Sequence, residues 1–294
     1  MRKIRYYSSF CDDFEESANQ SYVLPDGYQW VRTDLFSKFL SGLIYGLAVI
    51  FGGLYCRCIL HMKIRGRKNL KGVKGGFFIY GNHTQPVGDV FIPALCVLPR
   101  RIYTVVSPAN YGIPVIGKIL PYLGALPTVN SMHGMKQLHS AMTYRLKKGH
   151  PITIYPEAHV WEYYTGIRPF PDTSFKFPVK FGVPAFAMTV TYKRSRLFRR
   201  PIMEVFFDGP FYPEGDTAKE KTADLHRKIY STMKTRSEGS NYDYIVYKPQ
   251  ETPCPCTKTN NRPLHIRRCC DIMDYKNSNT PFVIFITPQI VRWQ

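Results

Sequence analysis

Two apolar runs in this chain each stop abruptly at a polar turn, and this repeated pattern limits the folds open to it. The first run, Gly76–Tyr80, leads into Gly81–Asp89, and the second, Ile152–Tyr155, leads into Pro156–His159. Short apolar runs bounded by glycine or proline are typical of buried strands. Strands that end beside each other in an α/β sheet place their following loops in one crevice, so we expect both turns to face the same cavity.

The first turn carries a histidine and a carboxylate, the two groups that form an oriented general base. Neutral imidazole accepts a proton near pH 7, and a carboxylate on its other nitrogen fixes the tautomer. On a regular helix His83 and Asp89 would point about 120° apart. Pro86 and Gly88 favour a tight turn instead, so we expect the two side chains to meet. The alternative is that Asp89 only caps a helix over Val90–Leu98 and that His83 is a loop histidine.

The second turn places Glu157 and His159 directly after its strand. We expect both to face the cavity that His83 faces. A polar residue after a strand also begins any exposed loop, so this turn alone does not distinguish a site from a surface loop.

The remaining periodicities predict an α/β fold with a mixed, largely parallel central sheet covered by helices. We expect further strands over Met62–Ile64, Ile102–Val106, Ala185–Thr191 and Ile202–Phe207. We expect helices over Val90–Leu98, Met135–Lys148 and Thr217–Lys234, the last with Asp216 as its N-cap. Both polar turns then lie on one edge of the sheet.

Four short blocks occur in order along the chain. They are Asn82–Asp89, Leu123–Pro127, Tyr155–Glu157 and Gly182–Met188. In this order the blocks resemble those of the glycerophospholipid acyltransferase family, over roughly Met62 to Tyr247. The first looks like the catalytic His-Asp block, here as HxxxxxD, and the third like a Phe-Pro-Glu-Gly motif. The resemblance implies a glycerolipid acyltransferase-like fold.

Three departures separate this chain from the family pattern. The family usually places four residues between His and Asp, whereas here five intervene. The second block normally ends in an arginine near the substrate phosphate, and here no arginine stands between Gly124 and Lys136. The third normally continues Gly-Thr-Arg, and here it continues Ala158–Val160. We therefore expect phosphate recognition from His159, Arg168 or Lys176, each of which is alternatively a solvated surface cation.

The resemblance implies acyl transfer in which His83, held by Asp89, takes the proton of the acceptor hydroxyl. The donor is an acyl-CoA or acyl carrier protein thioester, the acceptor is 1-acylglycerol 3-phosphate (lysophosphatidic acid), and the product is phosphatidic acid. No cofactor or metal is implied, and Asn82, Thr84 and Glu157 are expected to join the substrate-binding residues. The alternatives are glycerol 3-phosphate as acceptor and a non-catalytic membrane lipid-binding protein. A serine esterase is not expected, because no Gly-x-Ser-x-Gly motif occurs.

The formal net charge of +19 predicts attraction to anionic surfaces such as membrane lipids, nucleic acid or an acidic carrier protein. Nucleic acid is not the expected partner, because zinc-finger spacing and aromatic RNA-binding blocks do not occur. The segment Phe39–Tyr55 has no charged residue and lies between Lys38 and Arg57. It is a short transmembrane helix, an interfacial helix or a core helix, and we favour membrane attachment.

These patterns predict four regions. They are a polar N-terminal extension (1–35), a membrane-associated apolar helix (36–60), an acyltransferase domain (61–248) and a disordered tail (249–294). The extension has no secretory signal and the cysteines form no disulfide pattern, so we expect a location on the cytoplasmic face of a membrane. Cys254, Cys256, Cys269 and Cys270 lack the spacing of common zinc ribbons, and no metal site is expected.

Overall fold

The computed structural model describes residues 2–15 and 21–250 of the 294-residue chain. The predicted tail, with its four cysteines and the apolar run Phe282–Ile286, lies outside the described residues except for its first two positions. Within the described part, Cys11, Cys56, Cys58 and Cys96 are free thiols.

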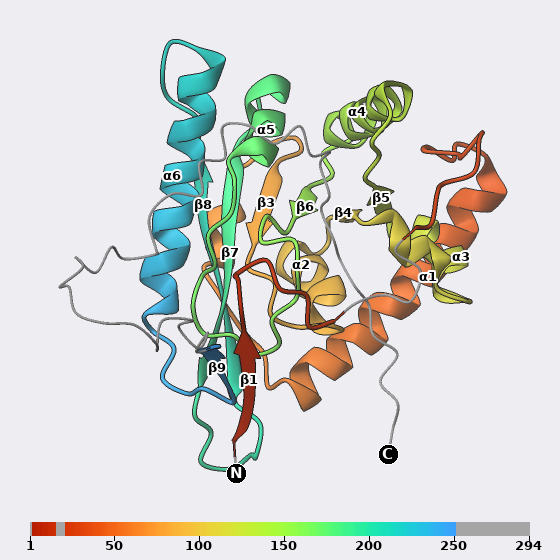
Figure 1. Cartoon of the computed structure of the whole chain (residues 1–294). Coiled ribbons are helices and arrows are strands. Elements are labelled where there is room, and N and C mark those ends of the chain that lie inside the picture. The colour runs from red at the N-terminus through yellow and green to blue at the C-terminus, as the bar shows by residue number, and fades with distance from the viewer. Residues whose placement is uncertain (1, 16–20, 251–294) are drawn as a thin grey trace, which may run out of the picture.

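A mixed, largely parallel sheet forms the centre of the protein (Figure 1). Its strands are β2 (Lys63–Arg65), β3 (Phe78–Gly81), β4 (Tyr103–Val106), β5 (Ala125–Pro127), β6 (Ile152–Ile154), β7 (Ala185–Lys193) and β8 (Ile202–Phe211). Their order is β2-β8-β7-β3-β6-β4-β5, and β7 and β8 form the antiparallel pair. The predicted fold class is confirmed, and every predicted strand is present within a few residues of its expected bounds.

Alternating side chains along the strands build a hydrophobic core on each face of the sheet. In β3, Phe78 and Tyr80 enter one core, whereas Ile79 enters the other. The helices α1 (Leu35–Leu54), α2 (Gly88–Val97) and α3 (Ile116–Leu123) cover the face of Ile79. The helices α4 (Met132–Lys147), α5 (Lys176–Phe181) and α6 (Ala218–Ser237) cover the other face (Figure 1).

Short helical turns complete the described chain. They are the π-helix η1 (Tyr55–Ile59) and the 3-10 helices η2 (Arg67–Leu70), η3 (Pro108–Gly112) and η4 (Thr173–Phe175). The N-cap of α6 is Thr217, so the prediction of Asp216 is wrong by one residue. Thr217 accepts a hydrogen bond from the Glu220 amide at 3.1 Å, and the Glu220 carboxylate accepts from the Thr217 amide at 3.1 Å. In this capping box the side chains of Thr217 and Glu220 each accept a hydrogen bond from a backbone amide at the start of α6. Asp216 does not take part in this pair of hydrogen bonds.

The N-terminal residues pack against the domain that we expected to begin at residue 61. Strand β1 (Lys3–Tyr7) pairs in parallel with β9 (Ile245–Pro249) in a separate two-stranded sheet. The Arg5 guanidinium bridges Glu15 at 2.9 Å and Glu162 at 3.4 Å. Residues 2–15 therefore form part of the folded body, and we call them the N-terminal segment.

The predicted apolar segment forms α1, which lies along the domain. The described residues contain one helix long and apolar enough to cross a membrane, Leu35–Ile59, and only 11% of its most apolar window is buried. The Ser41 hydroxyl donates to the Tyr122 carbonyl at 2.8 Å, and the Tyr45 hydroxyl accepts from the Ile102 amide at 3.1 Å. The face of α1 that carries Tyr45 and Val49 packs against the hydrophobic core, as the core-helix alternative expects, and the opposite face is exposed.

Candidate active site

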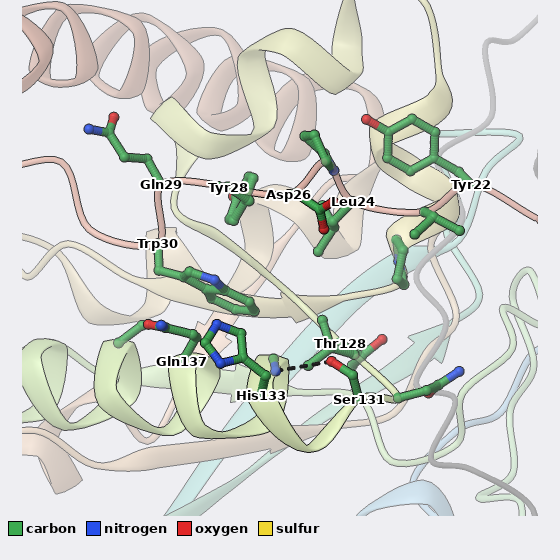
Figure 2. Close-up of a pocket in the computed structure, with 18 of the residues that line it drawn as sticks. Tyr22, Leu24, Asp26, Tyr28, Gln29, Trp30, Thr128, Ser131, His133 and Gln137 are labelled. Atoms are coloured by element: carbon green, nitrogen blue, oxygen red, sulfur yellow. Dashed lines mark hydrogen bonds between the residues drawn. The ribbon is translucent and has the colours of Figure 1, made fainter.

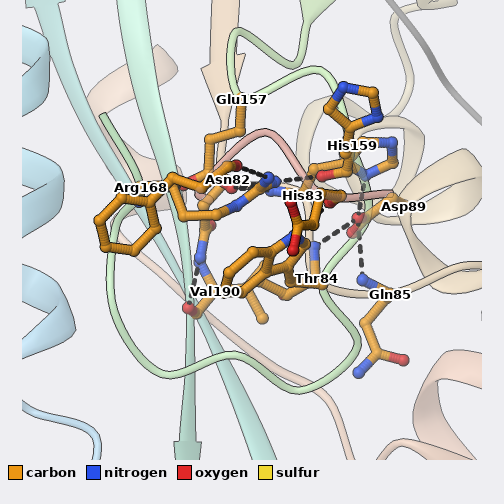
Figure 3. Close-up of polar contacts among 12 residues, drawn as sticks. Asn82, His83, Thr84, Gln85, Asp89, Glu157, His159, Arg168 and Val190 are labelled. Atoms are coloured by element: carbon orange, nitrogen blue, oxygen red, sulfur yellow. Dashed lines mark hydrogen bonds and ion pairs between the residues drawn. The ribbon is translucent and has the colours of Figure 1, made fainter. Parts of the chain in front are cut away.

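The two polar turns lie side by side, because β3 and β6 are neighbouring parallel strands. The Trp161 amide donates to the His83 carbonyl at 3.0 Å, and the Tyr163 amide donates to the Thr84 carbonyl at 2.9 Å. Backbone hydrogen bonds thus join the loop after β6 to the turn after β3. The sequence prediction that both turns share one edge of the sheet is confirmed (Figure 3).

His83 and Asp89 are in direct contact. Imidazole Nδ1 lies 2.7 Å from Asp89 Oδ2, and both side chains are fully buried. The Thr84 and Gln85 amides each donate to the same oxygen at 2.9 Å. Three donors therefore hold this carboxylate in place. The Asp89 carboxylate thus accepts hydrogen bonds from the preceding turn, and the N-cap residue of α2 is Val87, whose side chain makes no capping hydrogen bond. The interpretation of Asp89 as a helix cap is therefore wrong.

The second imidazole nitrogen of His83, Nε2, is buried and has no hydrogen-bond partner among the described residues. Buried polar atoms are nearly always paired, so an unpaired one requires an explanation. The Asp89 carboxylate accepts a hydrogen bond from Nδ1–H, which leaves the lone pair of the neutral ring on Nε2. A nitrogen in this state can accept a proton from a hydroxyl group placed beside it.

Tyr155 is a member of the site whose role the sequence did not reveal. Its ring stacks on the His83 imidazole at 4.5 Å between centroids, and its hydroxyl donates to the Asp89 carbonyl at 2.7 Å. Burial raises the pKa of Tyr155 well above its ordinary value, so the phenol keeps its proton. Gly81 makes this packing possible, because a Cβ there would lie 2.7 Å from the Tyr155 ring.

Glu157 and Arg168 form a buried ion pair behind the His83 turn. Glu157 Oε2 accepts from the His83 amide at 3.1 Å and from the Arg168 guanidinium at 3.2 Å, and Oε1 accepts from the Arg168 amide at 2.9 Å. The guanidinium also donates to the carbonyls of Phe10 and His159. Arg168 is 1% exposed. Its expected contact with a substrate phosphate is therefore not available in this structure, and both residues instead support the turn.

Asn82 and Thr84 connect the turn to β7. The Asn82 side chain donates to the Val190 carbonyl at 3.0 Å and accepts from the Val190 amide at 2.7 Å. The Thr84 hydroxyl lies 2.8 Å from the Tyr192 hydroxyl. Both side chains are buried and use their polar atoms within the protein, in place of the substrate contacts that we expected.

His159 contacts the N-terminal segment. Its Nδ1 lies 3.1 Å from Asp13 Oδ2. Burial alone would raise the pKa of Asp13, but hydrogen bonds from His159 and from the Glu15 backbone bring it below the ordinary value. Lys176 is exposed at the start of α5, and no hydrogen bond within the described chain connects it to this cluster.

The N-terminal segment covers the loop that follows β6. The Trp161 indole donates to the Asp12 carbonyl at 2.9 Å, and Tyr7, Phe10 and Phe14 stack around the indole at 4.9–5.9 Å between centroids. With this segment in place His83 is 0% exposed. No short-range sequence signal predicted this cover.

A cavity of about 1140 Å³ opens elsewhere on the same edge of the sheet, beyond the ends of β4 and β5. It lies between residues 22–31 on one side and the loop after β5 with the start of α4 on the other (Figure 2). None of the residues that we expected at the site lines it. Among the described residues no group of three His, Cys, Asp or Glu side chains is placed to hold a metal ion.

Comparison with known proteins finds a similar fold among solved structures. No protein family model matches the chain. No curated protein matches it either. The fold is similar to that of the 1-acyl-sn-glycerophosphate (LPA) acyltransferase PlsC from Thermotoga maritima, with a TM-score of 0.51 and 15% sequence identity. The similarity covers 71% of this chain and 88% of that one. The two proteins therefore share an architecture.

Proposed function

We propose that this protein is an acyltransferase that moves a fatty acyl group from an acyl-CoA or acyl carrier protein thioester to the hydroxyl of 1-acylglycerol 3-phosphate, giving phosphatidic acid. The observation that carries the proposal is the His83–Asp89 pair at 2.7 Å with an unpartnered imidazole nitrogen. The fold similarity to a lysophosphatidic acid acyltransferase supports the same assignment. The acceptor and donor come from that similarity and from the sequence motifs.

In the proposed reaction, His83 Nε2 takes the proton of the acceptor hydroxyl as the hydroxyl oxygen attacks the thioester carbonyl carbon. The carbon–oxygen bond forms and the carbonyl electrons move to oxygen, giving a tetrahedral oxyanion. When this collapses, the carbon–sulfur bond breaks and the imidazolium returns its proton to the leaving thiolate. Asp89 stabilises the imidazolium throughout, and the enzyme forms no covalent intermediate.

The other residues of the cluster act through the His83 turn. Glu157 receives the His83 amide, and Arg168 neutralises the Glu157 carboxylate. Asn82 and Thr84 attach the turn to β7. We therefore assign these four as positioning residues that hold the imidazole within the narrow range of geometry that proton transfer needs.

Access to His83 requires movement, because the imidazole is fully buried in this structure. The N-terminal segment is the element to move, since it packs on the loop after β6 through Asp12 and Asp13. Its departure would release His159 from Asp13, and we propose that His159 then contacts the acceptor phosphate. Burial of His83 also supports the second candidate, a lipid-binding protein without turnover.

The deciding experiment is single-turnover acyl transfer in phospholipid vesicles. The acceptors are 1-acylglycerol 3-phosphate and glycerol 3-phosphate, and the donors are acyl-CoA and acyl carrier protein. We expect transfer by the wild type and a loss on the order of a hundredfold or more in His83→Ala. Asp89→Asn should lose a comparable amount, because an amide no longer fixes the tautomer.

A matched control is His150→Ala. His150 precedes β6, at the opposite edge of the sheet from His83, and its loss should leave the transfer rate within about twofold if only His83 carries the proton. Equal rates in wild type and folded His83→Ala would remove the general-base assignment. If the wild type binds lipid but transfers no acyl group with any donor and acceptor, the non-catalytic alternative is established.

A further inference from the structure

The loop between β7 and β8 combines strong positive charge with an exposed apolar tip. Residues 194–200 read Arg-Ser-Arg-Leu-Phe-Arg-Arg. Leu197 is 87% exposed and Phe198 is 48% exposed. Both apolar side chains stand between pairs of arginines on the same loop, which gives the tip an amphipathic character. Figure 1 shows the loop extending beyond the sheet, near the N-terminus and the last turn of α1.

The arginines of this loop are not neutralised within the described part of the chain. No carboxylate there lies within ion-pair distance of Arg194, Arg196, Arg199 or Arg200. Neighbouring cations on the same hairpin differ in this respect. Lys193 lies 2.6 Å from a Glu204 carboxylate oxygen, for example. The positive charge of the loop is therefore not neutralised by a carboxylate of the described chain, and it can attract an external anion.

A cavity of about 720 Å³ lies beneath the loop. Its cationic lining consists of Arg2, Lys3, Arg194, Arg199 and Arg200. Its one carboxylate, Glu162, is already within 3.4 Å of the Arg5 guanidinium. Guanidinium forks match the oxygen geometry of a phosphate group, so the charge and shape of this cavity suit a phosphorylated headgroup.

The position of the loop relates it to the apolar helix. Tyr55, the residue directly after α1, lines the cavity. The Phe198 ring stacks on His61 at 3.7 Å between centroids. The outward face of α1 exposes Phe36, Phe39, Leu43, Leu47, Ile50, Phe51 and Leu54. The loop therefore lies next to the residues that directly follow α1.

We propose that residues 194–200 dock on a membrane containing anionic phospholipids. The arginines bind headgroup phosphates, partly in the cavity beneath the loop, while Leu197 and Phe198 insert at the boundary between headgroups and acyl chains. The loop thereby adds a charge-selective contact to the charge-independent contact expected of α1. This proposal concerns binding, and it does not depend on the acyl-transfer reaction.

The test is co-sedimentation of the full chain with two kinds of vesicle, one of phosphatidylcholine alone and one of phosphatidylcholine with phosphatidylglycerol. We expect the wild type to bind the anionic vesicles more tightly and to lose that preference as salt rises. Replacing the four loop arginines by glutamine should weaken binding to anionic vesicles on the order of a hundredfold or more, because four basic residues that each contribute about a factor of five multiply to several hundredfold. Binding to neutral vesicles should stay unchanged.

A matched control removes four charges elsewhere. The control substitutions are Lys147→Gln, Lys148→Gln, Lys219→Gln and Lys234→Gln, at exposed positions on α6 and at the end of α4. If this control loses as much anionic preference as the loop variant, net charge alone drives binding and the proposal is wrong. Unchanged binding of the loop variant overturns it equally. Thermal unfolding of both variants checks that they are folded.

A second variant examines the apolar tip. Leu197→Ser with Phe198→Ser should weaken binding to both kinds of vesicle, because insertion does not depend on headgroup charge. Glycerol 3-phosphate is the soluble competitor. One outcome would exclude membrane docking by the loop. In that outcome glycerol 3-phosphate binds the wild type saturably but not the arginine variant, whereas the arginine variant still binds vesicles. The cavity would then be a site for a soluble phosphate.

Discussion

The Tyr155 ring lies nearly parallel to the His83 imidazole, with 4.5 Å between ring centroids and 20° between planes. The Tyr155 hydroxyl also donates to the Asp89 carbonyl at 2.7 Å. One side chain directly after β6 thus restrains both members of the pair that follows β3. Because Tyr155 is fully buried, its ring cannot move without displacing His83.

Tyr155→Phe should separate the two roles of this side chain. The ring remains, but the buried Asp89 carbonyl loses its donor. We expect the free energy of unfolding to fall by about 1–3 kcal/mol, with a smaller effect on the acyl-transfer rate because the stacked ring still holds His83. Urea unfolding and single-turnover transfer measure the two quantities. Unchanged stability would show that this hydrogen bond contributes nothing.

Gly81→Ala should disturb the same packing from the other side. A Cβ at this position would lie 2.7 Å from the Tyr155 ring and 2.9 Å from the Met188 methyl carbon. Overpacking of this kind typically costs about 1–3 kcal/mol, and displacement of the ring should also slow acyl transfer. Gly46→Ala in α1 is the control, because nothing lies within 4 Å of its added Cβ. A Gly81→Ala protein as stable and active as the control would contradict this account.

Arg168→Met should be among the most destabilising single changes in the site. It leaves the fully buried Glu157 carboxylate without its cation, at a cost of about 3–5 kcal/mol. Arg65→Met is the comparison, since Arg65 is 57% exposed and the buried Glu204 carboxylate keeps a second cation, Lys193, at 2.6 Å. That change should cost less than about 1 kcal/mol. Chemical denaturation of both variants decides the matter, and equal losses would refute the buried-pair argument.

Asp13→Asn should loosen the N-terminal segment in a pH-dependent way. The pKa of Asp13 in the folded protein lies below the ordinary 3.8, so its contribution is fully present above that pH. The contribution is lost as the pH falls through the lowered folded value. We therefore expect faster amide hydrogen exchange in residues 3–15 of the variant at pH 6, and convergence with the wild type in acid.

The same variant bears on access to His83. If the N-terminal segment must move before an acceptor reaches the imidazole, Asp13→Asn should raise the transfer rate at neutral pH. Asp172→Asn, an exposed carboxylate next to η4, serves as the charge-matched control. Faster exchange without faster transfer would show that the segment opens but does not limit access.

Local sequence signals predicted much of the scaffold. The turn with Pro86 and Gly88 indicated that His83 and Asp89 meet, and they do so at 2.7 Å. Strands and helices of ordinary length were also predicted near their bounds. The strand β5 and the pairing of β1 with β9 were not predicted, because Ala125–Pro127 contains no β-branched residue and a β pairing depends on the partner strand.

The roles of Arg168, Asn82 and Glu157 were decided by tertiary structure. Arg168 was a candidate phosphate ligand because it follows the Glu157 turn closely enough to line the same pocket, yet the fold buries it against Glu157. Asn82 binds Val190, more than a hundred positions away, and the N-terminal segment covers the loop after β6. Turn and strand preferences arise from atoms a few bonds apart, so the residues of a segment encode them. The path of the whole chain determines which polar groups meet in the interior. Because an unpaired polar group is costly to remove from water, such groups are buried together with a hydrogen-bonding or charged partner.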